Sequence, residues 1–199
     1  MNTYQVGHII HKMEKYSKVE NSPIFKFAQI SYPTRLEAMA LDPSMVEINA
    51  QNDYRAGQMI LKVAIFRNCT VKVVEGSEIV ISKNSSKSVL CLHAALLMKY
   101  LLNFNCGLEI EYTEGLDRRH TGLGSSSGCI AAVSVAINEL FGNLVEKRDL
   151  INFIVKNHGE EMDSMPDQIV PVQCLGGSAI SGHYDGGLLI SSGDRFVIG

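Results

Sequence analysis

The chain has 199 residues, of which 46% are hydrophobic, and this length is enough to bury one substantial core. Its formal net charge of −3 supplies no surplus of positive charge for nucleic-acid phosphates, so we expect no nucleic-acid partner. The sequence shows neither the roughly 20 apolar residues of a membrane-spanning helix nor the apolar core of a signal peptide. We therefore expect a cytoplasmic protein with no membrane partner, and homodimer formation stays open.

The first third of the chain is predicted to contain an N-terminal arm followed by strands. Apolar residues at helical spacing, followed by Asn21-Ser22-Pro23, predict a short helix or an arm over residues 1–23. Arg67 and Asn68 separate two strand-like runs and are predicted to form the turn of a hairpin. The predicted strands are 24–32, 36–41, 59–66, 69–75 and 78–81.

The rest of the chain alternates between helical and strand patterns. Apolar residues recur every third or fourth position in three segments, and Gly107, Gly142 and Gly159 are placed to end these helices. The predicted helices are 86–104, 127–141 and 147–157, and the predicted strands are 108–113 and parts of the Gly-rich tail after residue 169. This order of elements predicts one α+β domain.

The five cysteines are widely spaced and lie among apolar residues rather than in close pairs. This spacing is typical of reduced thiols in the core of a cytosolic protein, and it does not resemble a zinc site.

The segment Thr121-Gly122-Leu123-Gly124-Ser125-Ser126-Ser127-Gly128 carries the strongest functional signal. It precedes a predicted helix, whose first turn presents unpaired N–H groups and the positive end of the helix dipole. Its glycines let the main chain approach phosphate oxygens, and its serines can cap the helix, bind phosphate or hold Mg²⁺. A turn that only caps a buried helix is the plain alternative. The predicted phosphate-binding residues are Gly122, Leu123, Gly124, Ser125, Ser126 and Ser127.

This segment resembles the phosphate loop of the GHMP kinases, a family named after galactokinase, homoserine kinase, mevalonate kinase and phosphomevalonate kinase. The Gly-Leu-Gly-Ser-Ser core and the Ala-rich helix after it carry the resemblance, whereas His120 or Thr121 stands where the family usually has a proline. The resemblance implies a GHMP-kinase-type N-terminal domain over residues 24–199, with a mixed sheet packed against helices. It also implies transfer of the γ-phosphate of Mg-ATP to a small metabolite.

The segment Tyr32-Pro33-Thr34-Arg35-Leu36 is similar to the first motif of this family, in which a basic residue approaches the transferred phosphate. The similarity implies that Arg35 assists catalysis. A surface arginine on an edge strand is the alternative.

The family's catalytic aspartate has no counterpart in the usual place within residues 177–187. Either Asp185, Asp163 or Asp167 supplies the general base from a shifted position, or the reaction depends on electrostatic positioning alone, which phosphoryl transfer tolerates. Asp185 and Asp167 are therefore candidate catalytic residues beside Arg35.

Glu160 and Glu161 follow Gly159 at the end of a predicted helix, where acidic side chains are mildly unfavourable. This position favours a functional role, in which Glu161 and Ser126 hold Mg²⁺. A solvated surface pair is the alternative.

Two further functions stay open. The chain also resembles the ribofuranosylaminobenzene phosphate synthases, a branch of the same family that uses phosphoribosyl diphosphate in place of ATP. The family's C-terminal glycine-rich motif is not found after residues 188–193, so we expect the C-terminal domain to be largely absent. A non-catalytic relative with a structural or regulatory role is therefore the third candidate.

Overall fold

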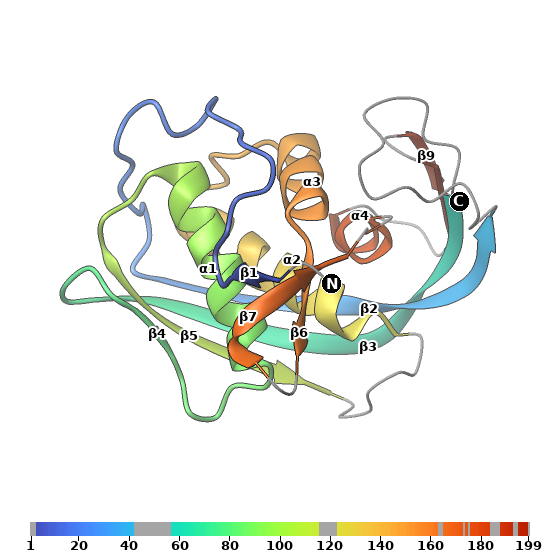
Figure 1. Ribbon diagram of the computed structural model, residues 1–199, viewed down its shortest axis with the longest axis horizontal. Coiled ribbons are helices and arrows are strands. Elements are labelled where there is room, and N and C mark those ends of the chain that lie inside the picture. The colour runs from blue at the N-terminus through green and yellow to red at the C-terminus, as the bar shows by residue number, and fades with distance from the viewer. Residues whose placement is uncertain are drawn as a thin grey trace.

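The computed structural model describes residues 3–41, 57–115, 123–162, 165–172, 174, 176–183, 188–192 and 195–198. These residues form an α+β fold in which helices pack against a six-stranded sheet and a three-stranded sheet lies to one side (Figure 1). The strands of the larger sheet are β2 (Phe27–Leu41), β3 (Gly57–Val74), β4 (Ile79–Ile81), β5 (Gly107–Glu114), β8 (Leu188–Ser192) and β9 (Arg195–Ile198).

The long antiparallel pair of β2 and β3 organises the larger sheet. The free side of β3 pairs with β8 over one stretch and with β5 over another, and all three pairings are antiparallel. β9 extends the sheet antiparallel to β8, whereas β4 lies parallel to β5. The sheet is therefore mixed, as the family resemblance implied.

The smaller sheet places β7 (Met165–Pro171) between β1 (Tyr4–Gln5) and β6 (Gly159–Met162). The helices are α1 (Ser88–Leu102), α2 (Ser125–Leu140), α3 (Lys147–Lys156) and α4 (Gly177–His183). Within the described ranges, every helix is too short or too polar to span a lipid bilayer.

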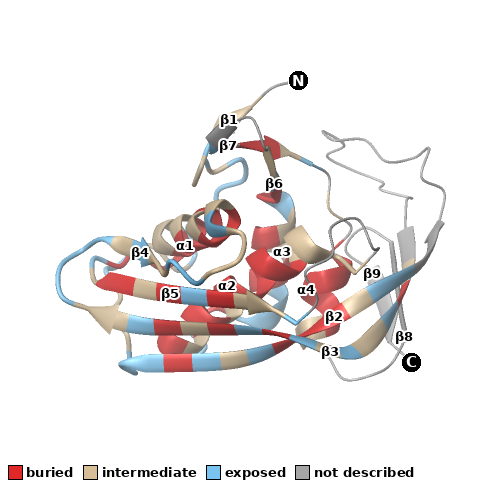
Figure 2. Ribbon diagram, turned by 90° about the horizontal axis from the view of Figure 1, so that it is seen from below, coloured by how far each residue is buried: buried red, intermediate tan, exposed pale blue. Residues whose placement is uncertain are grey.

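The core lies between the helices and the larger sheet, where buried residues gather (Figure 2). α2 packs on β2 and β3 and also contacts α1. Its small residues, among them Ala131 and Ala132, are fully buried, and their short side chains allow this close approach. On β5 the buried side chains of Leu108, Ile110 and Tyr112 alternate with more exposed ones, as expected for a strand with one face on the core.

The cysteines are unpaired thiols, as predicted. Cys69, Cys91 and Cys129 are buried in the core, and burial raises the pKa of the Cys129 thiol well above its usual value.

The predicted hairpin at residues 59–75 is wrong, because β3 runs through it as one strand. Arg67 and Asn68 look like turn residues in the sequence, but in the structure they pair with Tyr32 and Ser31 on β2. The two strands predicted on either side of Pro33 are likewise one strand, β2, with register shifts after Pro33 and after Glu37. A β-bulge can accommodate a proline in this way.

The N-terminal segment forms an arm rather than a helix. Apart from β1, residues 3–26 contain no helix or strand, although Ile9, Met13 and Tyr16 pack on the core. Side chains of other elements bind backbone groups of this arm, so it needs no helical hydrogen bonds of its own.

Candidate phosphate-binding site

α2 begins at Ser125, two residues before the predicted start, and Gly124 is its N-cap residue. Gly124 has φ 64° and ψ 48°, a left-handed conformation that glycine adopts at little cost. It has no side chain to cap the first N–H groups of the helix, so these groups remain available to an anion.

Gly124 lies against two polar side chains from distant parts of the chain. A Cβ atom added to Gly124 would lie 2.5 Å from Ser178 Oγ and 2.8 Å from Arg35 Nε. Arg35 Nε donates a hydrogen bond to Ser178 Oγ at 3.3 Å, and Ser178 Oγ lies 2.7 Å from Ser127 Oγ. β2, α4 and α2 therefore each bring one polar side chain to this turn.

Tyr32 holds α4, and with it Ser178, in place. Its buried hydroxyl donates hydrogen bonds to the backbone oxygens of Ser178 and Ala179 at 2.9 and 3.0 Å. Gly182 lies so close to the Tyr32 ring that an added Cβ atom would overlap it.

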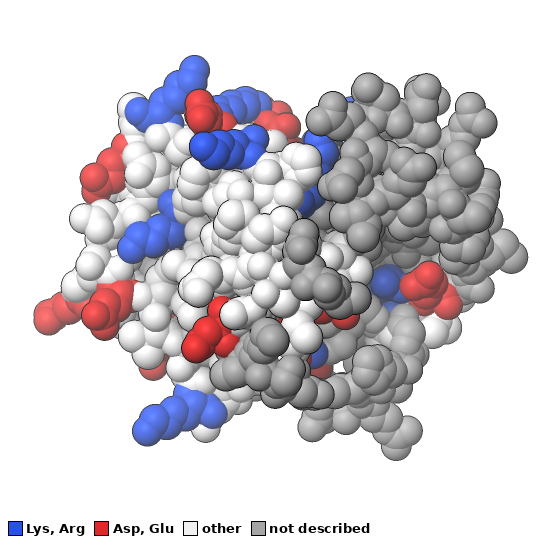
Figure 3. Space-filling model, viewed as in Figure 1, with Lys and Arg blue, Asp and Glu red and all other residues white. Residues whose placement is uncertain are grey.

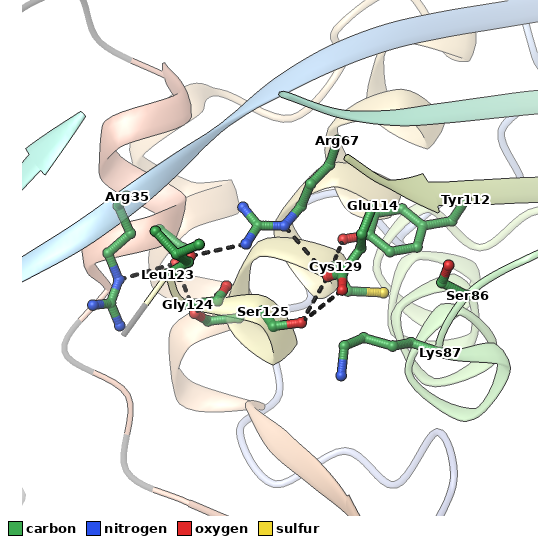
Figure 4. Close-up of polar contacts among 12 residues, drawn as sticks. Arg35, Arg67, Ser86, Lys87, Tyr112, Glu114, Leu123, Gly124, Ser125 and Cys129 are labelled. Atoms are coloured by element: carbon green, nitrogen blue, oxygen red, sulfur yellow. Dashed lines mark hydrogen bonds and ion pairs between the residues drawn. The ribbon is translucent and has the colours of Figure 1, made fainter. Parts of the chain in front are cut away.

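A second arginine, Arg67, lies on the other side of the turn. Its Nη2 atom donates a hydrogen bond to the backbone oxygen of Leu123 at 2.8 Å, and its Nε atom lies 3.4 Å from Glu114 Oε1. Figure 4 shows Arg35 on one side of Leu123 and Gly124 and Arg67 on the other.

Glu114, at the end of β5, faces the first residue of α2. Its two carboxylate oxygens lie 2.7 and 2.9 Å from Ser125 Oγ, and Oε1 also accepts a hydrogen bond from the Tyr112 hydroxyl at 2.9 Å. The sequence analysis missed both residues, because it placed Arg67 in the turn of a hairpin and ended the predicted strand at residue 113, before Glu114.

His158, which directly precedes β6, is buried. Burial, with smaller contributions from His93 and Arg35, lowers the pKa of His158 to about 4. The imidazole is therefore neutral at neutral pH.

Of the two predicted metal ligands, Ser126 lies in the first turn of α2, whereas Glu161 does not lie at the end of a helix as expected. Glu161 lies in β6, and its carboxylate forms an ion pair with Lys87 Nζ at 3.1 Å, in which both side chains are largely buried. Among the described residues, no cluster of three or more His, Cys, Asp or Glu side chains could hold a metal ion. The assignment of Ser126 and Glu161 to Mg²⁺ stays a prediction.

Of the three candidate general bases, the structure describes Asp167 alone. Asp167 lies on β7 in the smaller sheet, where its side chain is exposed and makes no hydrogen bond or ion pair with the described residues. Asp185, Asp163 and Gly122 lie outside the described residues.

Residues 88–177 match the family model described as the GHMP kinases N terminal domain. This segment of the chain is therefore similar to the GHMP kinase N-terminal domain. The matched residues run from α1 through α2 to the first residue of α4, and they include the turn at Gly124. No curated protein matches the chain.

Solved structures support the same fold. The mevalonate kinase of Methanococcus jannaschii aligns with a TM-score of 0.61 and 14% identity, over 88% of this chain and 56% of that chain. A putative sugar kinase from Campylobacter jejuni aligns with a TM-score of 0.62 and 13% identity, over 89% of this chain and 59% of that chain. The homoserine kinase of Cytophaga hutchinsonii aligns with a TM-score of 0.53 and 16% identity, over 87% of this chain and 50% of that chain. The chain therefore spans between 50% and 59% of the length of these proteins, and at such identities the likeness concerns the fold alone.

Proposed function

We propose that this chain is a small-molecule kinase of the GHMP type, which transfers the γ-phosphate of Mg-ATP to a small metabolite. The observation that carries the proposal is the start of α2, where Gly124 leaves the first N–H groups uncapped and Arg35 lies beside them. Uncapped N–H groups, the positive end of a helix dipole and a guanidinium together favour a phosphate group.

The residues around the turn would divide the work of binding and transfer. The backbone N–H groups of Ser125, Ser126 and Ser127 hold phosphate oxygens, and Gly124 lets the chain approach them closely. Arg35 stabilises the negative charge on the group in transfer, a role worth several kcal/mol in related chemistry. Mg-ATP, when bound, supplies the phosphoryl group and a cation that offsets phosphate charge.

Mg²⁺ would take oxygen ligands from Ser126 and Glu161 in addition to the nucleotide phosphates. Glu161 already has a cationic partner in Lys87, so it would exchange this ammonium group for the metal ion. Asp185 stays the candidate base for the hydroxyl of the acceptor, because Asp167 lies on the smaller sheet.

Titration calorimetry tests the proposal with Mg-ATP and, separately, with Mg-phosphoribosyl diphosphate. The informative variant is Gly124→Ala, since its Cβ atom would meet Ser178 and Arg35. Gly76→Ala is the matched control, because Gly76 also has a positive φ, of 91°, but its added Cβ atom would have no neighbour within 4 Å.

We expect saturable binding of Mg-ATP to the wild type and to Gly76→Ala, and none to Gly124→Ala. Binding of the sugar diphosphate alone would support the synthase-type transferase instead. A folded protein that binds neither compound would contradict the kinase proposal and favour the non-catalytic relative.

A further inference from the structure

We infer that Arg67 and Glu114 form a positioning pair, which holds the phosphate-binding turn in place from the side of the core. Each member of the pair binds one neighbour of Gly124. Arg67 holds the backbone oxygen of Leu123, the residue before it, and Glu114 holds the hydroxyl of Ser125, the residue after it. The assignment of nucleotide affinity to this pair rests on the proposed function, whereas its effect on the turn does not.

The pair is more deeply buried than a surface ion pair. The side chain of Arg67 is 3% exposed and that of Glu114 is 9% exposed. Removing two charges from water is unfavourable unless good geometry and further hydrogen bonds offset the loss. Here the ionic contact is long, at 3.4 Å, and the Nη1 atom of Arg67 is buried without a partner among the described residues.

Such a pair is a poor stabiliser, because apolar side chains of the same volume would bury area without stranding a donor. Apart from the hydrogen bond that Glu114 accepts from the Tyr112 hydroxyl at 2.9 Å, the short hydrogen bonds of the pair go to the turn, at 2.7 to 2.9 Å. The geometry therefore favours a role in fixing the position of Leu123 and Ser125 over a role in global stability.

Gly128 provides the room for this arrangement. A Cβ atom added there would lie 2.7 Å from Arg67 Nη1 and 2.8 Å from Arg67 Cζ. The guanidinium therefore lies directly against the first turn of α2, and Gly128 is the residue that admits it.

The contact with Glu114 also decides what Ser125 offers to a ligand. A serine hydroxyl has one hydrogen atom, and in this geometry that atom points to the carboxylate of Glu114. The side of Ser125 Oγ that faces a ligand then carries only lone pairs, which repel phosphate oxygens. Phosphate contacts at this position come from the backbone N–H group, and the hydroxyl serves to anchor the turn.

The test compares Ser125→Ala and Glu114→Gln with Tyr112→Phe. Tyr112→Phe is the matched control, because it removes a hydroxyl from the same carboxylate but does not involve the turn. Hydrogen–deuterium exchange of the ligand-free protein reports on the backbone of residues 123–131, and thermal unfolding reports on global stability.

We expect Ser125→Ala and Glu114→Gln to accelerate exchange in residues 123–131 by about tenfold, which corresponds to about 1.4 kcal/mol of local opening. In Tyr112→Phe, exchange in residues 123–131 should stay at the wild-type rate. This should hold even if the thermal midpoint of Tyr112→Phe falls as far as the midpoints of the other two variants. Equal acceleration in all three variants, or none in the first two, would overturn the inference.

Calorimetry with Mg-ATP adds the functional readout. If the wild type binds, each of the first two variants should bind about tenfold more weakly, and the double variant should be no weaker than the weaker single one. Additive losses in the double variant would contradict a shared role. If the wild type does not bind, the kinase proposal fails, and the exchange comparison still decides the positioning role.

Discussion

The Nδ1 atom of His93 accepts a hydrogen bond from the backbone N–H of Gly7 at 3.0 Å, across 86 positions of the sequence. The other ring nitrogen, Nε2, lies 3.0 Å from the backbone oxygen of Asn157 and therefore carries the proton. Burial lowers the pKa of His93, in keeping with this neutral form. One buried imidazole on α1 thus joins the N-terminal arm to the end of α3.

The side chain of Asn157 completes this attachment, and its removal should be costly. Its Oδ1 atom accepts hydrogen bonds from the N–H groups of Ile10 and His11 at 2.8 and 2.9 Å. Its Nδ2 atom donates to the backbone oxygens of His11 and Phe153. Asn157→Ala leaves several of these groups unpaired, so we expect a loss of about 3 kcal/mol in the free energy of unfolding.

Denaturant unfolding measures the effect of Asn157→Ala, with Asn84→Ala as the control. Asn84 is exposed, so its variant should stay within about 0.5 kcal/mol of the wild type. Equal stability of the two variants would show that the arm is not held in this way.

The pH dependence of stability should follow the buried histidines. The pKa of His158 is about 4 in the folded protein and near 6.5 in the unfolded chain, so the unfolded state binds more protons between these values. Stability is therefore fully present above pH 6.5 and falls by about 3 kcal/mol as the pH drops toward 4.

Unfolding free energies measured between pH 7.5 and pH 4 check this expectation. His158→Gln should flatten the curve, whereas replacement of the exposed His11 by Gln should leave its shape unchanged. A wild-type curve that is flat down to pH 5 would rule out the proposed cause.

Gly182 should tolerate no side chain, because a Cβ atom there would overlap the ring of Tyr32. Gly182→Ala is expected to destabilise the protein by about 2 kcal/mol through overpacking. Because Tyr32 binds the backbone of α4, the substitution should also move Ser178 away from Gly124. The smaller side chain of Tyr32→Leu should recover part of the lost stability in the double variant, as a thermal denaturation series would show.

Arg35 should matter for turnover far more than for stability. Its ion pair with Glu37 is partly exposed and worth less than about 1 kcal/mol, so Arg35→Met should unfold close to the wild-type midpoint. If the kinase proposal holds, kcat of the same variant should fall about 100-fold, because the variant lacks the guanidinium that stabilises negative charge on the transferred phosphate. Steady-state kinetics with Glu37→Gln as the control separates the two effects, since that variant keeps the guanidinium. A similar loss in both variants would assign the effect to the ion pair instead.

Charge is distributed in a mixed way over the visible face of the described residues. Figure 3 shows Lys and Arg side chains interspersed with Asp and Glu side chains rather than gathered into one band. Arg35 and Arg67, which lie beside Gly124 and Leu123, are a local pair of cationic side chains at the start of α2.

Local patterns in the sequence were sufficient to predict the helices and strands whose residues interact mainly with near neighbours or with one buried face. The predictions of α1, α2 and α3 are confirmed to within two residues at each end, and β5 is confirmed with one further residue at each end. Periodic apolar residues and a glycine or polar residue at each end are local signals, so they can be recognised without knowledge of the tertiary structure. Likewise, the similarity of residues 88–177 to the GHMP kinase N-terminal domain could be anticipated from Gly124 and the serines after it.

The features that the sequence analysis missed depend on contacts between distant positions. Arg67 was predicted to lie in a turn and Glu114 beyond the end of a strand, yet both lie in strands and contact each other across 47 positions of the sequence. Ser178 gave no signal at all, since only the packing of α4 on Tyr32 brings it to Arg35. The sequence by itself therefore determined the fold class, and it singled out the turn at Gly124 as the candidate phosphate-binding segment. Only the tertiary structure decided which charged side chains hold that turn, because a buried charge is stable only where its partner lies, and no local pattern encodes that partner.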